Sequence, residues 1–189
     1  MRQLIGALLV GLSIASSSDA ADAWSRFRGE NGSGLAAAGS KLPTEVGPDK
    51  HVVWKVALPP GHSSPAVVGD RIYVTGERDQ KLVTIGLDKV SGKILWEREA
   101  PHEKFERVHG IGSHAQCSPT ADNERVVSLF GSCGLFCYDR DGKELWKIPM
   151  GPFKNDFGSG TSPLIVDDRV ILCQDHDTDS FLMSVGQQT

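Results

Sequence analysis

The sequence has no excess of positive charge. Its 20 lysines and arginines are outnumbered by 24 aspartates and glutamates, and the formal net charge is -4. Binding to nucleic acid or to an anionic membrane needs a basic face, so neither partner is predicted. The sequence also has no apolar run of roughly 20 residues, the length that a transmembrane helix needs. We therefore expect no nucleic-acid partner and no transmembrane segment.

Cysteine is scarce, and its spacing fits no common metal or haem motif. The spacing of the four cysteines matches neither a zinc site nor the CxxCH motif of haem attachment. An exported chain could oxidise its thiols, but connectivity does not follow from sequence. The simpler interpretation is that the cysteines are buried, apolar side chains on strands. The four residues concerned are Cys117, Cys133, Cys137 and Cys173.

The first residues have the pattern of a secretory signal peptide. Arg2 precedes the apolar run Leu4 to Ile14, and the small residues of "SSSDAADA" follow it. A positive n-region, a short apolar h-region and small residues at a cleavage site define such a leader. The sequence predicts a signal peptide at residues 1–20, with cleavage possibly at residue 23. The mature protein is then periplasmic or secreted.

Helical periodicity is almost absent after residue 51, and short apolar runs separated by turn residues take its place. Such runs are "VVWKVAL" (52–58), "PAVV" (65–68), "RIYVTG" (71–76), "KLVTIGL" (81–87) and "KILWERE" (93–99). Pairs such as Gly69-Asp70 and Asp141-Gly142 lie between runs, where hairpins need residues that tolerate positive φ. The pattern predicts an all-β meander.

The meander is repetitive. Ser-Pro opens three similar stretches at Ser64, Ser118 and Ser162, which are 54 and 44 residues apart. Each stretch continues through a turn to an arginine and an apolar run. In two copies it ends in an Asp, Gly-Lys, Leu-Trp phrase, "GLDKVSGKILW" and then "CYDRDGKELW". Four antiparallel strands in about 45 residues form one blade of a β-propeller.

The repeated phrase has a structural explanation. A four-stranded blade buries its faces by stacking on its neighbours, and a tryptophan on the last strand can fill the wedge between two sheets. The aspartate ahead of each turn accepts hydrogen bonds from backbone N–H groups, and the glycine takes the positive-φ position. We assign these structural roles to Trp54, Asp88, Gly92, Trp96, Asp139, Gly142 and Trp146.

These motifs resemble a known repeat. The phrase "LDxxxGKxLW", closing a unit that begins "SSPxVxxDRxYV", resembles the pyrroloquinoline-quinone-like (PQQ-like) repeat. That repeat occurs in quinoprotein dehydrogenases and in propellers without the cofactor, among them the lipoprotein of the outer-membrane β-barrel assembly machinery. The N-terminal "WSRFRGENGSGL" (24–35) is similar to the start of secreted planctomycete-type proteins of this family. The resemblance implies a propeller and is weak for function.

The third unit is shorter than the other two. It runs "FLMSVGQQT", which places Gly186 where the repeat has aspartate. We expect an N-terminal segment at residues 21–50 and an incomplete propeller at residues 51–189, with about two and a half to three blades. Propellers close with about four to eight blades, so the remaining blades would be needed for ring closure. The pattern is typical of the N-terminal piece of a longer protein, of a truncated gene or of a deliberate fragment.

Two polar loops are the candidate binding sites. Loops between blades lie on one rim of a propeller, so "PHEKFERVHGIGSHAQ" (101–116) and "GPFKNDFGSG" (151–160) should meet there. The candidate rim-binding residues are His109, His114, Lys154 and Asp156. No catalytic residues are assigned. No metal site is assigned either, because "DHDTDS" (175–180) begins like a calcium loop but has Ser180 and Gly186 where that loop needs glycine and glutamate.

Two functions compete. The first is a non-enzymatic exported scaffold, without cofactor, that binds a protein or another extracellular ligand through its rim. The alternative is a fragment of a PQQ-dependent alcohol or sugar dehydrogenase, in which the propeller would hold the quinone and a calcium ion. The resemblance implies a disulfide between adjacent cysteines in alcohol-oxidising members, and this sequence has no adjacent cysteines. We favour the scaffold.

Overall fold

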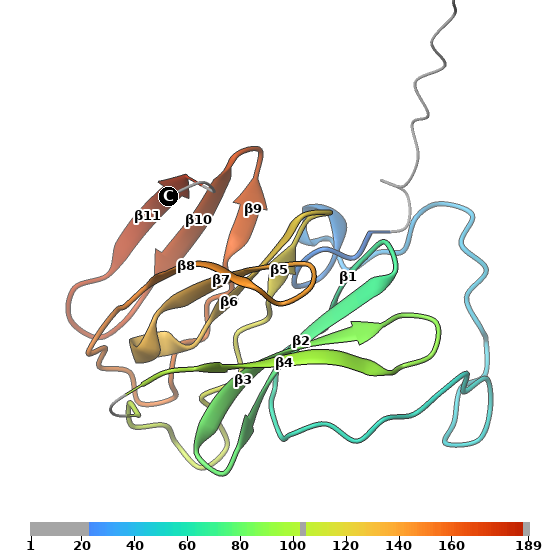
Figure 1. Cartoon of the computed structure of the whole chain (residues 1–189), viewed down its shortest axis with the longest axis horizontal. Coiled ribbons are helices and arrows are strands. Elements are labelled where there is room, and N and C mark those ends of the chain that lie inside the picture. Colours follow the sequence, from blue (N-terminus) through green and yellow to red (C-terminus); the bar gives the residue numbers. More distant parts are fainter. Residues whose placement is uncertain (1–22, 103–104, 187–189) are drawn as a thin grey trace, which may run out of the picture.

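The computed structural model describes residues 23–102 and 105–186, which form three antiparallel sheets in a fan (Figure 1). The predicted signal peptide at residues 1–20 lies outside the described residues. No helix in the described part of the chain is long and apolar enough to cross a membrane. The one helical turn before the sheets, η1, spans Glu30–Gly32.

Each sheet is an up-and-down meander in chain order. Blade 1 contains β1 (Ala66–Val68), β2 (Arg71–Arg78), β3 (Lys81–Asp88) and β4 (Ile94–Ala100). Blade 2 contains β5 (Thr120–Ala121), β6 (Arg125–Leu129), β7 (Leu135–Asp139) and β8 (Glu144–Ile148), with the 3-10 turn η2 (Gly131–Cys133) between β6 and β7. Blade 3 contains β9 (Leu164–Val166), β10 (Arg169–Gln174) and β11 (Phe181–Gly186). The prediction of an all-β fold of propeller blades is confirmed.

Strand register repeats from blade to blade. The arginine that opens the second strand lies opposite the last residue of the third strand, as Arg71 opposite Asp88 and Arg125 opposite Asp139. In blade 3, Arg169 lies opposite Gly186. Gly186 therefore occupies the aspartate position of the repeat, as the sequence alignment placed it.

Trp96 of the repeated phrase packs on the turn of the next copy of the phrase. Trp96 is buried between Tyr73 of blade 1 and Tyr138 of blade 2, with ring centroids 5.9 Å apart in both pairs. Its indole N–H donates to the carbonyl of Arg140 at 2.9 Å. A Cβ on Gly142, which has φ +82°, would lie 2.6 Å from the Trp96 ring. Glycine is needed there for both its φ and its lack of a side chain.

Trp54 makes the same contact one blade earlier. Its indole N–H donates to the carbonyl of Lys89 at 3.0 Å, and its ring lies against Gly92. The two carbonyls are equivalent, because each follows directly the aspartate that opens its turn. The aspartates hold these turns: Asp88 accepts from the Ser91 N–H at 2.7 Å and Asp139 from the Asp141 N–H at 2.9 Å.

The Ser-Pro motif also connects blades. The Ser64 N–H donates to Ser118 Oγ at 2.8 Å, and the Ser118 N–H donates to Ser162 Oγ at 3.0 Å. Each serine side chain thus accepts a bond from the backbone of the preceding unit. Buried backbone N–H groups need hydrogen-bond partners. The serine side chains supply these partners between blades, where no strand pairs with another.

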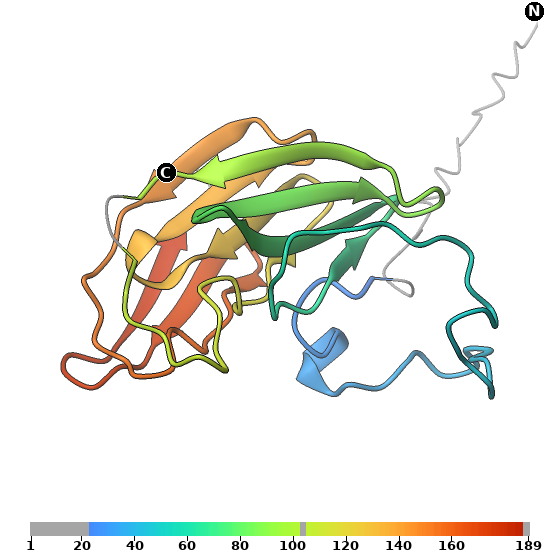
Figure 2. The same ribbon diagram turned by 90° about the horizontal axis from the view of Figure 1, so that it is seen from below.

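The prediction of a strand at residues 52–58 is wrong, because this segment is extended but forms no strand in the structure. A strand requires hydrogen bonds to a neighbouring strand. No strand among the described residues pairs with this segment, although Val56 packs on the apolar face of blade 1. In Figure 2 the chain from the N-terminal segment to β1 runs as an open loop beside the sheets.

The cysteines only partly fit the interpretation of buried strand residues, and all four are free thiols. Cys117 and Cys137 are buried between blades 2 and 3, where burial raises the pKa of each thiol to about 12. Cys133 is half-buried in η2, and Cys173 on β10 is exposed. Only Cys137 is therefore both buried and on a strand, since Cys117 precedes β5.

Candidate functional site

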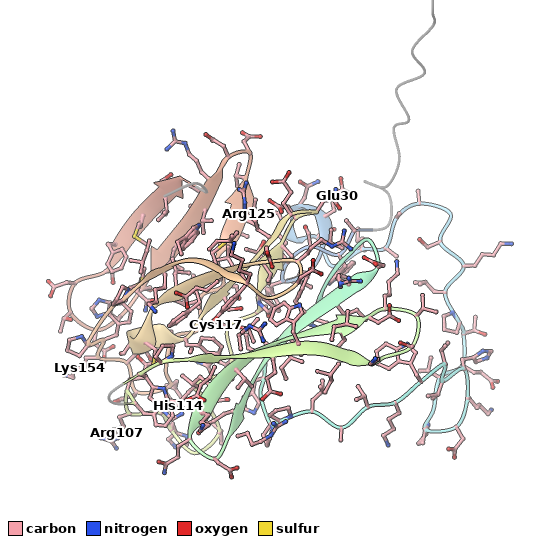
Figure 3. The ribbon with its side chains drawn as sticks, viewed as in Figure 1. Glu30, Arg107, His114, Cys117, Arg125 and Lys154 are labelled. Carbon is pink, nitrogen blue, oxygen red and sulfur yellow. The ribbon has the colours of Figure 1, made fainter. Side chains whose placement is uncertain are left out.

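One end of the blades gathers every long loop between sheets, and we call it the loop rim. It consists of the connections at residues 101–119 and 149–163 and the turns after β2, β6 and β10. Figure 3 shows Arg107, His114 and Lys154 at this end, whereas Arg125 and Glu30 lie toward the opposite end. The loops that sequence analysis selected are thus on the same rim.

A groove of about 420 Å³ opens on the loop rim between blade 1 and the connection to blade 2. The residues that line it include histidines, acidic residues and glycines. Its walls come from three separate parts of the chain: the stretch before β1, the end of β2 with the turn after it, and residues 108–114. The lining residues are Pro60, Gly61, His62, Glu77, Asp79, Val108, His109, Gly110, Gly112, Ser113 and His114.

His114 is held at both ring nitrogens. Nδ1 lies 3.0 Å from Glu77 Oε2, and Nε2 lies 2.9 Å from the carbonyl oxygen of Glu106. Both partners are hydrogen-bond acceptors. The Phe105 ring stacks on the imidazole at 4.4 Å. These contacts fix the orientation of the His114 ring in the wall of the groove. They also connect blade 1 to the loop that follows it.

Glu106 connects the loops of the rim. Its carboxylate accepts from the Ser132 N–H at 3.1 Å, from Ser132 Oγ at 2.5 Å and from the Ser159 N–H at 3.2 Å. One side chain thus connects the 101–119 loop, the turn after β6 and the 149–163 loop. Gly131 leaves the space that this carboxylate occupies, because a Cβ there would overlap it.

The predicted rim residues divide into two sets. His109 and His114 line the same groove. Lys154 and Asp156 are exposed on the neighbouring loop and do not line it. The backbone joins the two loops, because the His109 N–H donates to the Asp156 carbonyl at 2.9 Å. The Asp177 N–H, in the turn after β10, donates to the Lys154 carbonyl at 2.9 Å. Binding by any of the four stays a prediction.

Sequence analysis missed His62, Glu77 and Asp79 as groove residues. None belongs to a recognisable motif, and each reaches the groove from a different part of the chain. The repeat contained a signal that could have found them. In each blade the second strand ends at the same rim as the loops that join one blade to the next. That signal places Glu77 and Asp79 near the loop, although it does not reveal the pairing of Glu77 with His114.

The acidic side chains of the described residues do not gather into a calcium site. No group of three or more histidine, cysteine, aspartate or glutamate side chains in residues 23–102 and 105–186 is placed to hold a metal ion. In the "DHDTDS" turn, Ser180 Oγ donates to Asp175 Oδ1 at 2.6 Å, so this carboxylate serves the turn itself. A calcium ion needs 6–8 oxygen ligands, and these residues do not converge in such a set.

No family model and no curated protein matches the chain. Among solved structures, it is similar to a europium-containing methanol dehydrogenase, with TM-score 0.53, 19% identity, and coverage of 70% of this chain and 24% of that chain. It is also similar to the quinohemoprotein alcohol dehydrogenase ADHIIG from Pseudomonas putida HK5, with TM-score 0.53, 16% identity and coverage of 72% and 20%. BamB from Moraxella catarrhalis is a weaker match, with TM-score 0.40, 15% identity and coverage of 73% and 49%.

These similarities establish the fold. The chain is an all-β protein built from PQQ-like propeller blades, and it spans about a quarter or less of the length of the two dehydrogenases. Identities this low do not transfer an activity, since one fold carries many functions.

Proposed function

We propose that this protein is an exported, non-enzymatic propeller scaffold that binds an extended segment of a partner protein in the groove of the loop rim. The groove is the observation that carries the proposal: it is large enough for several side chains and is built from three parts of the chain. The predicted signal peptide supports a periplasmic or secreted location, where the partner would also be found.

The chemistry of the rim suits a peptide. Glu77 and Asp79 offer carboxylates, and Gly110 exposes its backbone in the groove. Ile111 and Phe157 expose apolar side chains on the two rim loops, and the His109 ring lies 5.2 Å from the Phe157 ring. Polar groups around exposed aromatic and aliphatic side chains are typical of protein-binding surfaces.

Two side chains near the rim that could act in catalysis, Cys117 and His114, form structural contacts instead. Cys117 is buried and its Sγ contacts the Ser159 carbonyl at 2.9 Å, while burial raises its pKa to about 12. A thiol with so high a pKa stays protonated near neutral pH and is a poor nucleophile. His114 is held by Glu77 and the Glu106 carbonyl. These contacts favour binding over catalysis.

Filling the groove should weaken binding. Gly110 lines the groove and Gly160 lies outside it, and a Cβ at either position meets no atom within 4 Å. We expect peptides selected from a random display library on the purified chain to bind Gly110→Trp at least about tenfold more weakly, the loss of about 1.4 kcal/mol. Gly160→Trp is the matched control and should bind normally. Equal binding by both variants, or no selected peptide, would contradict the proposal.

The quinone alternative is tested separately. We expect the purified chain, mixed with pyrroloquinoline quinone and calcium, to reduce no dye with alcohols or sugars. The reason is that the described carboxylates form no ligand set for the ion. Dye reduction is followed by absorbance, with a PQQ-dependent alcohol dehydrogenase as positive control. Saturable turnover that depends on calcium would instead support the dehydrogenase alternative.

A further inference from the structure

The groove of the loop rim carries acidic side chains and no permanently basic ones. Of the residues that line it, Glu77 and Asp79 are acidic, and none is a lysine or an arginine. The two acidic residues belong to the same wall, because Glu77 lies near the end of β2 and Asp79 lies in the turn that follows. A concave surface lined by charges of one sign concentrates their field, so this groove attracts positive charge.

The basic residues beside this wall are paired with other carboxylates. Arg78 Nη1 lies 3.1 Å from Glu97 Oε1, and Lys81 Nζ lies 2.9 Å from Glu99 Oε2. Both of these partners are on β4, the outer strand of blade 1. Among residues 23–102 and 105–186, no ion pair and no side-chain hydrogen bond holds the carboxylate of Asp79. This carboxylate is therefore available to a partner.

The rim itself positions Glu77. Its Oε2 lies 3.0 Å from His114 Nδ1, and the Phe105 ring stacks on that imidazole at 4.4 Å. The Glu77 side chain still has 28% of its surface exposed, and it lines the groove. A side chain whose conformation is already fixed loses less entropy when a partner binds. Glu77 is therefore an oriented carboxylate beside the freely accessible one of Asp79.

The groove also offers an apolar surface to a long side chain. Pro60 and Val108 line it together with the two acidic residues. Lysine and arginine bury their methylene stems along apolar surfaces and keep the charged group free to form a pair. Arginine can in addition donate two parallel hydrogen bonds to one carboxylate and stack on an aromatic ring, such as the imidazole of His109 in the same groove. The lining therefore matches a basic side chain along its whole length.

We propose that the partner segment bound in the groove carries a lysine or an arginine whose charged group pairs with Glu77 and Asp79. The stem of this side chain lies against Pro60 and Val108. The inference rests on the proposed function, because it names the chemistry of the segment that the groove binds. Complementary charge of this kind adds specificity and speeds association. Acidic segments are rejected, because they would bring like charges together.

Peptides selected from a random display library on the purified chain test the inference. We expect lysine or arginine in nearly all of the peptides whose binding Gly110→Trp weakens. In one such peptide, replacing that basic residue by glutamine should lower the affinity at least about tenfold. Groove-binding peptides without enrichment of basic residues would overturn the inference and leave the proposed function intact. If no selected peptide binds in the groove, both are wrong.

Asp79→Asn is the corresponding change in the protein. Asp79 has φ +52°, a conformation that asparagine also tolerates, so the turn after β2 should keep its structure. We expect this variant to bind a selected basic peptide several-fold more weakly at about 10 mM salt, and the difference to shrink at about 1 M, where charges are screened. Glu124→Gln is the matched control, because it removes one exposed negative charge from the turn between β5 and β6, away from the loop rim. Unchanged binding by Asp79→Asn, or equal weakening by the control, would overturn the inference.

Discussion

Replacing Trp96 by alanine is expected to lower the free energy of unfolding by about 3–5 kcal/mol, the usual cost of truncating a buried aromatic side chain. The indole is buried between two tyrosines, closes the junction of blades 1 and 2, and donates its N–H to the Arg140 carbonyl. Its removal leaves a cavity, and the Arg140 carbonyl loses its donor.

Leu95→Ala is the control, because Leu95 is the neighbouring residue on β4 and is 41% exposed. Its expected cost is below about 0.5 kcal/mol, as for most surface changes. Both values come from urea unfolding followed by tryptophan fluorescence and circular dichroism. The measurements use one low protein concentration, because association stabilises folded chains by mass action. A Trp96→Ala cost as small as the control would mean that this junction does not limit stability.

Replacing Glu106 by glutamine is expected to cost about 1.5–3 kcal/mol, the range for hydrogen bonds to a charged group. The carboxylate accepts from Ser132 and from the Ser159 backbone. A glutamine side chain keeps one acceptor oxygen but turns an NH₂ group toward these donors, so at least one bond is lost. Because Glu106 connects three rim loops, peptide affinity at the groove should fall as well.

Glu124→Gln provides the comparison for Glu106→Gln. The Glu124 carboxylate is exposed and contacts the adjacent Arg125 at 3.1 Å. Exposed ion pairs contribute about 0–1 kcal/mol, so its loss should be small and should leave the groove unchanged. If both variants unfold at the same urea concentration as the parent chain, the role assigned to Glu106 in holding the rim is wrong.

The candidate site was predicted only in part. Sequence placed His109 and His114 on loops between blades, and both line one groove. Glu106 lies on the same predicted rim loop, but its three bonds to Ser132 and Ser159 were not foreseen. Those partners are 26 and 53 residues away along the chain. Loop conformation depends on such distant contacts, and no periodic pattern encodes them.

Sequence alone determined the blade, because a blade is a local unit. Turn glycines, aspartate caps and alternating apolar residues act within a few residues of each other, and three similar copies predicted the same meander three times. Only the tertiary structure decided what lies between blades. It showed that Trp54 contacts the Lys89 carbonyl while its own segment lacks a strand partner, and that Cys173 faces outward. Stacking of blades brings together residues that are far apart in the sequence. Whether a side chain is buried therefore depends on which blade or segment covers its face.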